Sequence, residues 1–254
     1  MRLIRSDYSG NADKLYVAVF GDLHYGSKNY NENIVDEQLY FVKQHRDNCS
    51  ILFLGDLVEC ATKASVGRGI YDESANLNEQ FKYITSKFKP YADLIDGAVQ
   101  GNHCERIAQY CGLDLTETLC NTFGRDVYLG YRGYVVFSWN KVAYTFDIWH
   151  GATGGATDGG ALNALLKMKD TAFADVHLMG HTHKKLDIVK PIWMPDTRNG
   201  KPVLVNSLFV NTGCAMNNGG GYGEMKGYAP LDIGLPIIEL NGVKGQKQSK
   251  VIWL

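Results

Sequence analysis

GNHCER (Gly101–Arg106) places an amide, an imidazole, a thiol, a carboxylate and a guanidinium on consecutive side chains behind a glycine. It directly follows the apolar run LIDGAVQ (Leu94–Gln100), which predicts a buried strand. In α/β proteins, ligands bind outside the carboxyl ends of strands, and glycine there lets the backbone approach a bound group closely. The stretch therefore predicts a functional site where a strand ends.

Four further apolar runs predict strands that end in the same way. The runs LYVAVF, SILFL, VAYTFDIW and VHLM lead into GDLH (Gly21–His24), GDLVE (Gly55–Glu59), WHG (Trp149–Gly151) and GHTH (Gly180–His183). Five of the seven histidines fall in the five endings, with two aspartates and one asparagine. Each ending alone is typical of a turn. Together they predict one metal site, and we interpret the remaining His45 and His177 as structural.

Helical patterns lie between several of these strands. The clearest is expected to begin at a Ser74 cap and to stop before Pro90. Its apolar positions are Leu77, Phe81, Ile84 and Phe88. Other helices are expected at Glu32–His45, Glu105–Tyr110, Leu115–Phe123 and Ala161–Lys169. This alternation of strands and helices indicates an α/β fold.

After Lys185 the sequence changes to strands and turns. NGK at Asn199–Lys201 and NG at Asn241–Gly242 are hairpin signals, and a second sheet is expected here. The glycine-rich segment Gly213–Tyr228 is either a binding loop or a plain surface loop. We expect a single domain over residues 1–254, with an α/β part (1–185) that carries every motif and a mainly β part (186–254) that completes the second sheet.

Composition limits the class of protein. With 254 residues and 45% hydrophobic residues, the chain can bury the core of one large domain. A formal charge of -1 gives no general attraction to nucleic acid. The chain shows neither a signal-peptide core nor an apolar run of about 20 residues, so we expect a cytoplasmic protein that does not associate with membranes. Six cysteines without a CxxC pair predict free thiols.

In this order, the endings resemble the motifs of the calcineurin-like metallophosphoesterases: D-x-H, GD-x-x-D/E, GNH-D/E, a single H, and GH-x-H. They run from Asp22 to His183, and NTGC (Asn211–Cys214) is similar to the segment that follows in this family. Cys104 departs from the pattern, because the family usually has an acidic residue there; Glu105 is the candidate substitute. The resemblance implies a four-layer α/β/β/α sandwich of two mixed sheets flanked by helices, with the metal site at the carboxyl ends of strands.

The donors are too many for one tetrahedral ion and suit two ions about 3.5–4 Å apart. They are Asp22, His24, Asp56, Asn102, His150, His181 and His183. The resemblance implies that Asp56 bridges two divalent ions. It assigns Asp22, His24 and His183 to the first ion, and Asn102, His150 and His181 to the second. Mixed oxygen and nitrogen donors suit manganese first, and also iron, zinc, nickel or cobalt.

The resemblance further implies hydrolysis of a phosphate monoester or diester. Two divalent cations lower the pKa of a shared water and place a hydroxide opposite the leaving group for in-line attack. His103 is similar to the family residue that protonates or stabilises the leaving group. Arg106, Arg68 and Lys63 are candidates for contacts with the substrate phosphate.

Two other functions stay open. A nuclease of the DNA-repair branch of the family would carry the same ligands, and Lys184, Lys185 and Lys190 are suited to line a path for nucleic acid. A non-catalytic binding module would lack a ligand or the histidine after Asn102, and neither is missing. The substrate, the native metal and the oligomeric state do not follow from the sequence.

Overall fold

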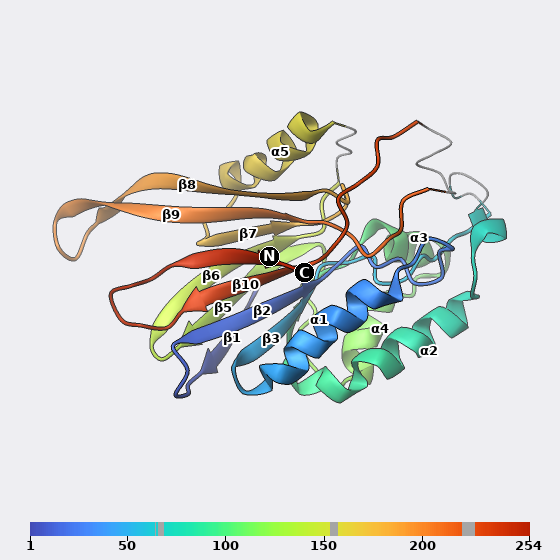
Figure 1. Ribbon diagram of the computed structural model, residues 1–254, viewed down its shortest axis with the longest axis horizontal. Coiled ribbons are helices and arrows are strands. Elements are labelled where there is room, and N and C mark those ends of the chain that lie inside the picture. The colour runs from blue at the N-terminus through green and yellow to red at the C-terminus, as the bar shows by residue number, and fades with distance from the viewer. Residues whose placement is uncertain (64, 66–68, 153–156, 220–226) are drawn as a thin grey trace.

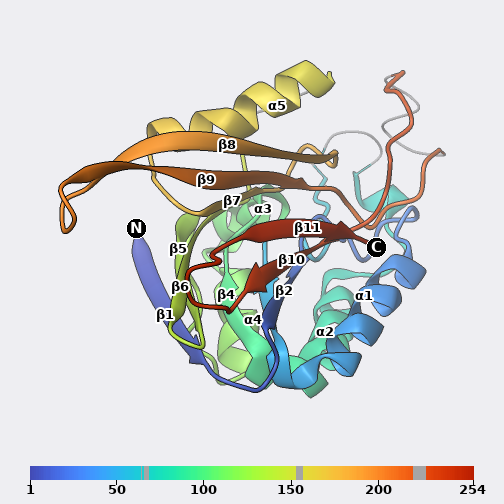
Figure 2. The ribbon, with the colours of Figure 1, turned by 60° about the vertical axis from the view of Figure 1, so that its left-hand side comes forward.

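Two mixed β-sheets lie face to face, with helices on their outer sides (Figures 1 and 2). The computed structural model describes residues 1–63, 65, 69–152, 157–219 and 227–254. Arg68 and residues 220–226 of the glycine-rich segment therefore lie outside the described residues. The layers confirm the predicted α/β/β/α sandwich.

The six-stranded sheet has the order β1-β5-β6-β7-β9-β8, and the five-stranded sheet has the order β11-β10-β2-β3-β4. β2, β3 and β4 are parallel, and so are β6, β7 and β9. The carboxyl ends of these strands therefore meet at one edge of each sheet. The strands are β1 (Arg2–Tyr8), β2 (Lys14–Phe20), β3 (Cys49–Phe53), β4 (Ile95–Ala98), β5 (Arg132–Trp139), β6 (Val142–Trp149), β7 (Val176–Met179), β8 (Lys185–Asp196), β9 (Lys201–Thr212), β10 (Pro236–Asn241) and β11 (Ser249–Trp253).

Helices cover the two outer faces unequally. α1, α2 and α4 pack on the outer face of the five-stranded sheet (Figures 1 and 2). On the six-stranded sheet, α5 lies over β7, β8 and β9. Among the described residues, no helix is long and apolar enough to cross a membrane. The helices are α1 (Glu32–Gln44), α2 (Leu77–Phe88), α3 (Asn102–Cys111), α4 (Leu115–Thr122) and α5 (Asp158–Leu166).

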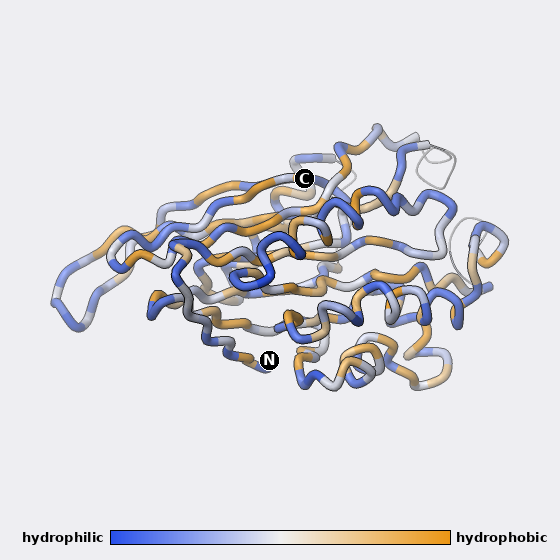
Figure 3. Tube along the Cα trace, turned by 60° about the horizontal axis from the view of Figure 1, so that its bottom comes forward, coloured by the Kyte–Doolittle hydropathy of each residue, from blue (hydrophilic) through white to orange (hydrophobic). Residues whose placement is uncertain are grey.

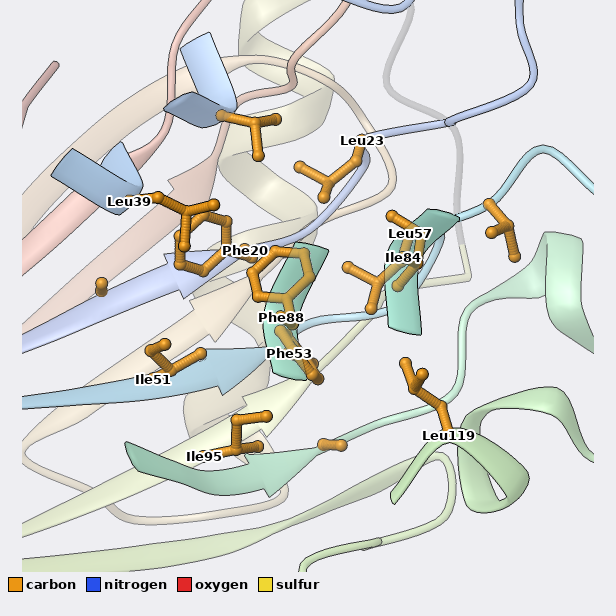
Figure 4. Packing of buried hydrophobic residues seen from close by; sticks show 14 of the residues in the cluster. Phe20, Leu23, Leu39, Ile51, Phe53, Leu57, Ile84, Phe88, Ile95 and Leu119 are labelled. Atoms are coloured by element: carbon orange, nitrogen blue, oxygen red, sulfur yellow. The ribbon is translucent and has the colours of Figure 1, made fainter. Parts of the chain in front are cut away.

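β2 shows how the sequence produces the layers. Successive side chains of a strand point to opposite faces. Leu15, Val17 and Val19 lie in the core between the sheets, whereas Ala18 and Phe20 lie between the sheet and its helices (Figure 4). Burying one such large apolar side chain contributes about 1.5–3 kcal/mol. The strand is thus fixed from both sides just before the GDLH ending.

The hairpin of β5 and β6 did not follow from the sequence. Its turn is Asn140-Lys141, and both residues have positive φ angles, of 48° and 70°. Such turns usually carry glycine at the second position, so WNKV lacks the usual hairpin signal. β1 was also missed, because this edge strand has no continuous apolar run and is largely exposed.

Three predicted helix starts are wrong, and one of them is that of α5, which begins at Asp158, three residues before the expected Ala161. Asn76, and not Ser74, caps α2: the Asn76 side chain accepts from the Glu79 N–H, and the Glu79 carboxylate accepts from the Asn76 N–H. The Ser74 hydroxyl instead donates to the Gly26 carbonyl. α3 begins at Asn102, three residues earlier than expected, so the GNH motif opens a helix instead of lying in a loop.

The C-terminal part supplies strands to both sheets. β8 and β9 extend the six-stranded sheet, whereas β10 and β11 extend the five-stranded one. The expectation that residues 186–254 complete a single second sheet is therefore corrected. The chain crosses between the sheets where the Gly234 N–H donates to the Cys214 carbonyl. Antiparallel pairing of β8 with β9 and of β10 with β11 confirms both hairpins. The single-domain organisation stays a prediction.

Candidate metal centre

The five strand endings bring the seven predicted donors to one place. Asp22, His24, Asp56 and His150 are at most 2% exposed. Polar groups buried this deeply are costly unless they have partners. The other three donors, Asn102, His181 and His183, contact members of this group.

The first group consists of Asp22, His24 and His183. Asp22 Oδ1 lies 3.3 Å from His183 Nε2 and 3.7 Å from His24 Nε2, and the two Nε2 atoms are 3.1 Å apart. Donors about 2.1 Å from a tetrahedral ion are about 3.4 Å from one another. The spacing therefore suits three ligands of a single ion.

The second group gathers around the Asn102 side chain. Asn102 Oδ1 lies 2.9 Å from His150 Nε2 and 2.8 Å from His181 Nδ1. Asp56 Oδ2 lies 3.0 Å from His150 Nε2. Donor atoms of Asp22, Asp56 and His150 all lie within 4.8 Å of one another, so the two groups adjoin.

Asp56 also anchors the beginning of α3. Gly101 is the N-cap of this helix and has no side chain to accept from its first N–H groups. Asp56 Oδ1 accepts from the His103 N–H at 2.8 Å. The carboxylate thus caps the helix from a distant strand end, where a negative charge is favoured by the helix dipole. Its other oxygen faces His150.

Backbone strain is concentrated at the same residues. Eight described non-glycine residues have positive φ angles, and five of them are predicted metal ligands: Asp22, His24, Asp56, His181 and His183. Side chains are uncommon in this conformation, which tends to persist at functional sites because the surrounding structure enforces it. The strain supports a functional role for the centre.

Two glycines are required by close approach. A Cβ atom on Gly101 would lie 2.1 Å from Asp56 Oδ1, and one on Gly180 would lie 2.5 Å from Asp22 Oδ2. No side chain fits at these distances. The glycines therefore let both carboxylates reach the centre.

Charges in the centre balance one another. Burial alone would raise the pKa of the Asp22 and Asp56 carboxyl groups, but nearby histidines, His150 foremost, outweigh it and hold both pKa values low. Burial lowers the pKa of His150, but Asp56 and Asp22 raise it to about 9. Two carboxylates thus stay negative in a buried place, which favours a bound cation.

The residues present fit divalent metal ions. Asp22 Oδ1 is buried and has no hydrogen-bond partner, although an unpaired buried carboxylate oxygen is costly. It points among the imidazole nitrogens of its group, where an ion would satisfy it. Imidazole, carboxylate and amide donors together suit first-row transition metals.

His103 borders the centre without belonging to either group. Its Nδ1 lies 2.7 Å from the Glu59 carbonyl oxygen, which can only accept, so Nδ1 carries a proton. Its Nε2 lies 4.0 Å from Asp56 Oδ2 and accepts from Arg106 Nη2 at 3.0 Å. Nε2 is therefore the nitrogen on the side of the centre, and a substrate would reach it by displacing Arg106.

Glu59 is the functional residue that the sequence reasoning missed. Its carboxylate lies 2.9 Å from His24 Nδ1 and 3.4 Å from His103 Nδ1. Burial would raise the pKa of Glu59, but His103 and His24 have the larger effect, so the pKa of Glu59 is below its usual value. The ending GDLVE contained the signal, because Glu59 is its second acidic residue.

Glu105 does not replace the missing acidic residue after GNH. Its carboxylate accepts from the Tyr131 hydroxyl at 2.9 Å, whereas Glu59 lies beside His103. Cys104 is buried, and the pKa of the neighbouring Cys60 thiol is raised by contact with Cys104 and by burial. Both are packed thiols.

The candidate phosphate-binding residues and the two histidines interpreted as structural lie in different surroundings. Arg106 lies beside His103 and donates to Ser65 Oγ at 3.3 Å. Lys63 is exposed, and Arg68 is not among the described residues. His45 ends α1, and His177 lies in β7 with its Nδ1 2.8 Å from Asp147 Oδ2, as expected of structural histidines.

Comparisons give similar folds at low identity. No protein-family model matches this chain, and a comparison with curated proteins finds no match. The chain is similar to a Vps29 variant from Entamoeba histolytica (16% identity, 94% of this chain and 99% of that chain, TM-score 0.42). It is also similar to a metallophosphoesterase from Sphaerobacter thermophilus (12% identity, 94% of this chain and 88% of that chain, TM-score 0.44). A third similar structure is a predicted phosphoesterase from Streptococcus pneumoniae (14% identity, 95% of this chain and 98% of that chain, TM-score 0.34). These values assign neither an activity nor a substrate to this chain.

Proposed function

We propose that this protein is a metal-dependent phosphoesterase that hydrolyses a phosphate monoester or diester. The observation that carries the proposal is the convergence of seven donors, with one buried carboxylate oxygen that has no hydrogen-bond partner, beside a histidine that belongs to neither ligand group. The Asp22 group would hold one divalent ion and the Asn102 group a second, with Asp56 between them. When bound, such ions supply positive charge to phosphoryl oxygens and acidify a water molecule.

The chain itself contributes orientation and a proton. The Glu59 carbonyl and carboxylate hold His103 by Nδ1, which leaves Nε2 directed toward the centre. When Arg106 turns from Nε2 to a phosphate oxygen and both ring nitrogens carry a proton, His103 would protonate the departing oxygen from Nε2 or stabilise its charge. Arg106 lies on the next turn of α3, and its guanidinium would bind a phosphate oxygen. Lys63 and Arg68 stay candidates for further phosphate contacts.

A nuclease is less well supported. Lys184 Nζ lies 2.7 Å from Asp158 Oδ1, and Lys185 Nζ lies 3.3 Å from Asp232 Oδ1. Lysines already paired with carboxylates contribute less to attracting a phosphate backbone. Nucleic acid therefore serves as a comparison substrate in the test.

The proposal is tested by assaying the protein with phosphomonoesters, phosphodiesters, and single- and double-stranded nucleic acids. Samples are stripped of metal and then reloaded separately with manganese, iron, zinc, nickel or cobalt. We expect hydrolysis of a small ester that disappears with a chelator and returns with metal. Cleavage of nucleic acid alone would favour the nuclease. Absence of hydrolysis with every metal, in a folded protein that binds metal, would contradict the proposal.

A further inference from the structure

The hairpin of β8 and β9 extends beyond the rest of its sheet (Figure 1). β7 pairs only with residues 208–211 of β9. Among the described residues, no third strand pairs with residues 189–207, which we call the ribbon. A two-stranded ribbon is only marginally stable in water by itself. The ribbon therefore needs further contacts.

One face of the ribbon continues the core between the two sheets. Leu208 and Val210 are buried in that core, and Leu204 lies on the same face farther along β9. On β8, Val189 is opposite Leu208 and Trp193 is opposite Leu204. Yet Val189 is 48% exposed, Trp193 69% and Leu204 55%. The apolar face thus runs on where the five-stranded sheet no longer covers it.

Such an exposed and mostly apolar stripe, interrupted only by Asn206 between Leu204 and Leu208, marks an interaction surface. Addition of a strand at the edge is disfavoured, because Pro191 and Pro195 lie on the edge strand β8 and cannot donate a backbone hydrogen bond. The partner must therefore pack against the face.

The charges at the two ends of this face are complementary. Exposed Arg198 lies in the hydrophilic turn at the tip (Figure 3), about 17 Å from Trp193 at 3.3 Å per residue. Exposed Asp187 lies on the same face in the other direction, about 20 Å from Trp193. Its Oδ1 accepts from Trp253 Nε1 at 3.1 Å, which leaves Oδ2 for a partner. A second ribbon laid antiparallel, with Trp193 at the centre, would bring each Arg198 near the other Asp187.

We propose that the ribbon docks on the ribbon of a second copy of this chain. The two copies are related by a two-fold axis near Trp193, with the uncharged side chains of Val189, Trp193 and Leu204 in the middle. Packing a neutral stripe against itself brings no like charges together, and an arginine and an aspartate meet at each end. The inference does not depend on the catalytic proposal.

The size of the face sets the expected affinity. The part of β8 in the ribbon, residues 189–196, is about 26 Å long at 3.3 Å per residue, and a two-stranded face is about 10 Å wide, which gives on the order of 300 Å² per copy. Stable complexes usually bury about 800 Å² per partner. We therefore expect a reversible dimer with a dissociation constant in the micromolar range.

Sedimentation velocity over roughly 1–200 μM, a range that brackets such a constant, tests the proposal. The full chain should shift from monomer to dimer as its concentration rises. Trp193→Ser should stay monomeric, whereas Tyr40→Ser, which removes an equally exposed aromatic ring from α1, should still dimerise. Circular dichroism checks that each variant is folded. A wild-type protein that stays monomeric, or a folded Trp193→Ser that still dimerises, would overturn the proposal.

A charge exchange tests the arrangement itself. Arg198→Glu and Asp187→Arg should each weaken dimerisation at least about tenfold, because each places like charges together at both ends. The double variant should regain most of the lost affinity. A double variant as weak as the single ones would exclude the antiparallel arrangement. Binding of the monomeric protein to neutral lipid vesicles, lost in Trp193→Ser, would assign the face to a membrane surface and reject the dimer.

Discussion

At the scale of single residues, the candidate centre consists of side chains whose burial and backbone conformations are each energetically unfavourable. Asp22 and Asp56 are buried carboxylates on strained backbone, and each is held by an N–H group from a distant motif: His181 for Asp22, and His103 for Asp56. Each such φ angle costs on the order of 1 kcal/mol. A bound cation would offset these costs, because it would pair with the carboxylates.

A variant of His103 can distinguish a role in catalysis from a role in metal binding. His103→Ala should keep the metal content and the fold and lower turnover by roughly 10²–10⁴-fold, the usual contribution of a positioned acid or base. The loss should be smaller for a nitrophenyl ester, whose leaving group needs no proton, than for an alkyl ester. Measuring kcat/KM for both esters, together with metal content, gives the comparison. His45→Ala, at the end of α1, is the matched control.

Two results would change the role of His103. An equal loss on both esters with metals intact would mean that His103 stabilises charge on the phosphoryl group instead of the leaving oxygen. Loss of a metal ion would make it a ligand.

Much of the centre was predictable from residues alone. All the donors except His150, which precedes Gly151, follow strand-ending glycines, and parallel strands bring such endings together. The role of Glu59 was not predictable in this way, because it depends on α3 beginning at Asn102 and placing the His103 ring against the Glu59 carbonyl, beyond the end of β3. Sequence spacing does not show the direction of a side chain.

At the scale of elements, a buried ion network ties β5, β6 and β7 together. Arg132 donates to both oxygens of Asp147, at 2.7 Å from Nε and 2.6 Å from Nη2, and His177 Nδ1 lies 2.8 Å from Asp147 Oδ2. Asp147 is fully buried. β6 and β7 carry His150 and His181 at their ends, so the network fixes two ligand-bearing strands.

Asp147→Asn should lower the free energy of unfolding by about 3 kcal/mol at pH 7, because it leaves Arg132 without its buried partner. Burial raises the pKa of Asp147, but the hydrogen bonds from Arg132 and His177 have the larger effect, so the pKa of Asp147 is below its usual value. The stabilisation is therefore present above the unfolded pKa of about 4 and is lost as the pH falls through the lower folded value.

Urea unfolding from pH 7 to about pH 3 measures this difference. The difference in the free energy of unfolding between the wild type and Asp147→Asn should become smaller below about pH 4. Asp7→Asn, which breaks the exposed pair with Arg5, should change stability little at any pH. A gap that stays constant in acid would show that the charge of Asp147 is not what stabilises the network.

The elements themselves were partly predictable. β6 and β7 have the predicted bounds, because their apolar runs are continuous and end in a recognisable motif. The start of α2 was misplaced, because Ser74 and Asn76 are both good caps and only the reciprocal pairing with Glu79 chooses between them.

At the scale of the whole molecule, the centre lies where the two sheets meet. Asp22, Asp56 and Asn102 follow strands of the five-stranded sheet, whereas His150 and His181 follow strands of the six-stranded one. Closing the sandwich therefore assembles the centre. The resemblance implied these layers, but it did not assign the C-terminal strands, because hairpin signals do not show which sheet a hairpin joins.

The most direct test of the account is a count of the metal ions and of their positions. Elemental analysis of the metal-loaded protein, with anomalous scattering from its crystals, should show two ions per chain, one in the Asp22 group and one in the Asn102 group. Asp56→Asn should weaken both ions together, whereas His24→Ala should mainly weaken the first. A saturated protein with a single ion would contradict the dinuclear centre, and an ion bound elsewhere would contradict the account as a whole.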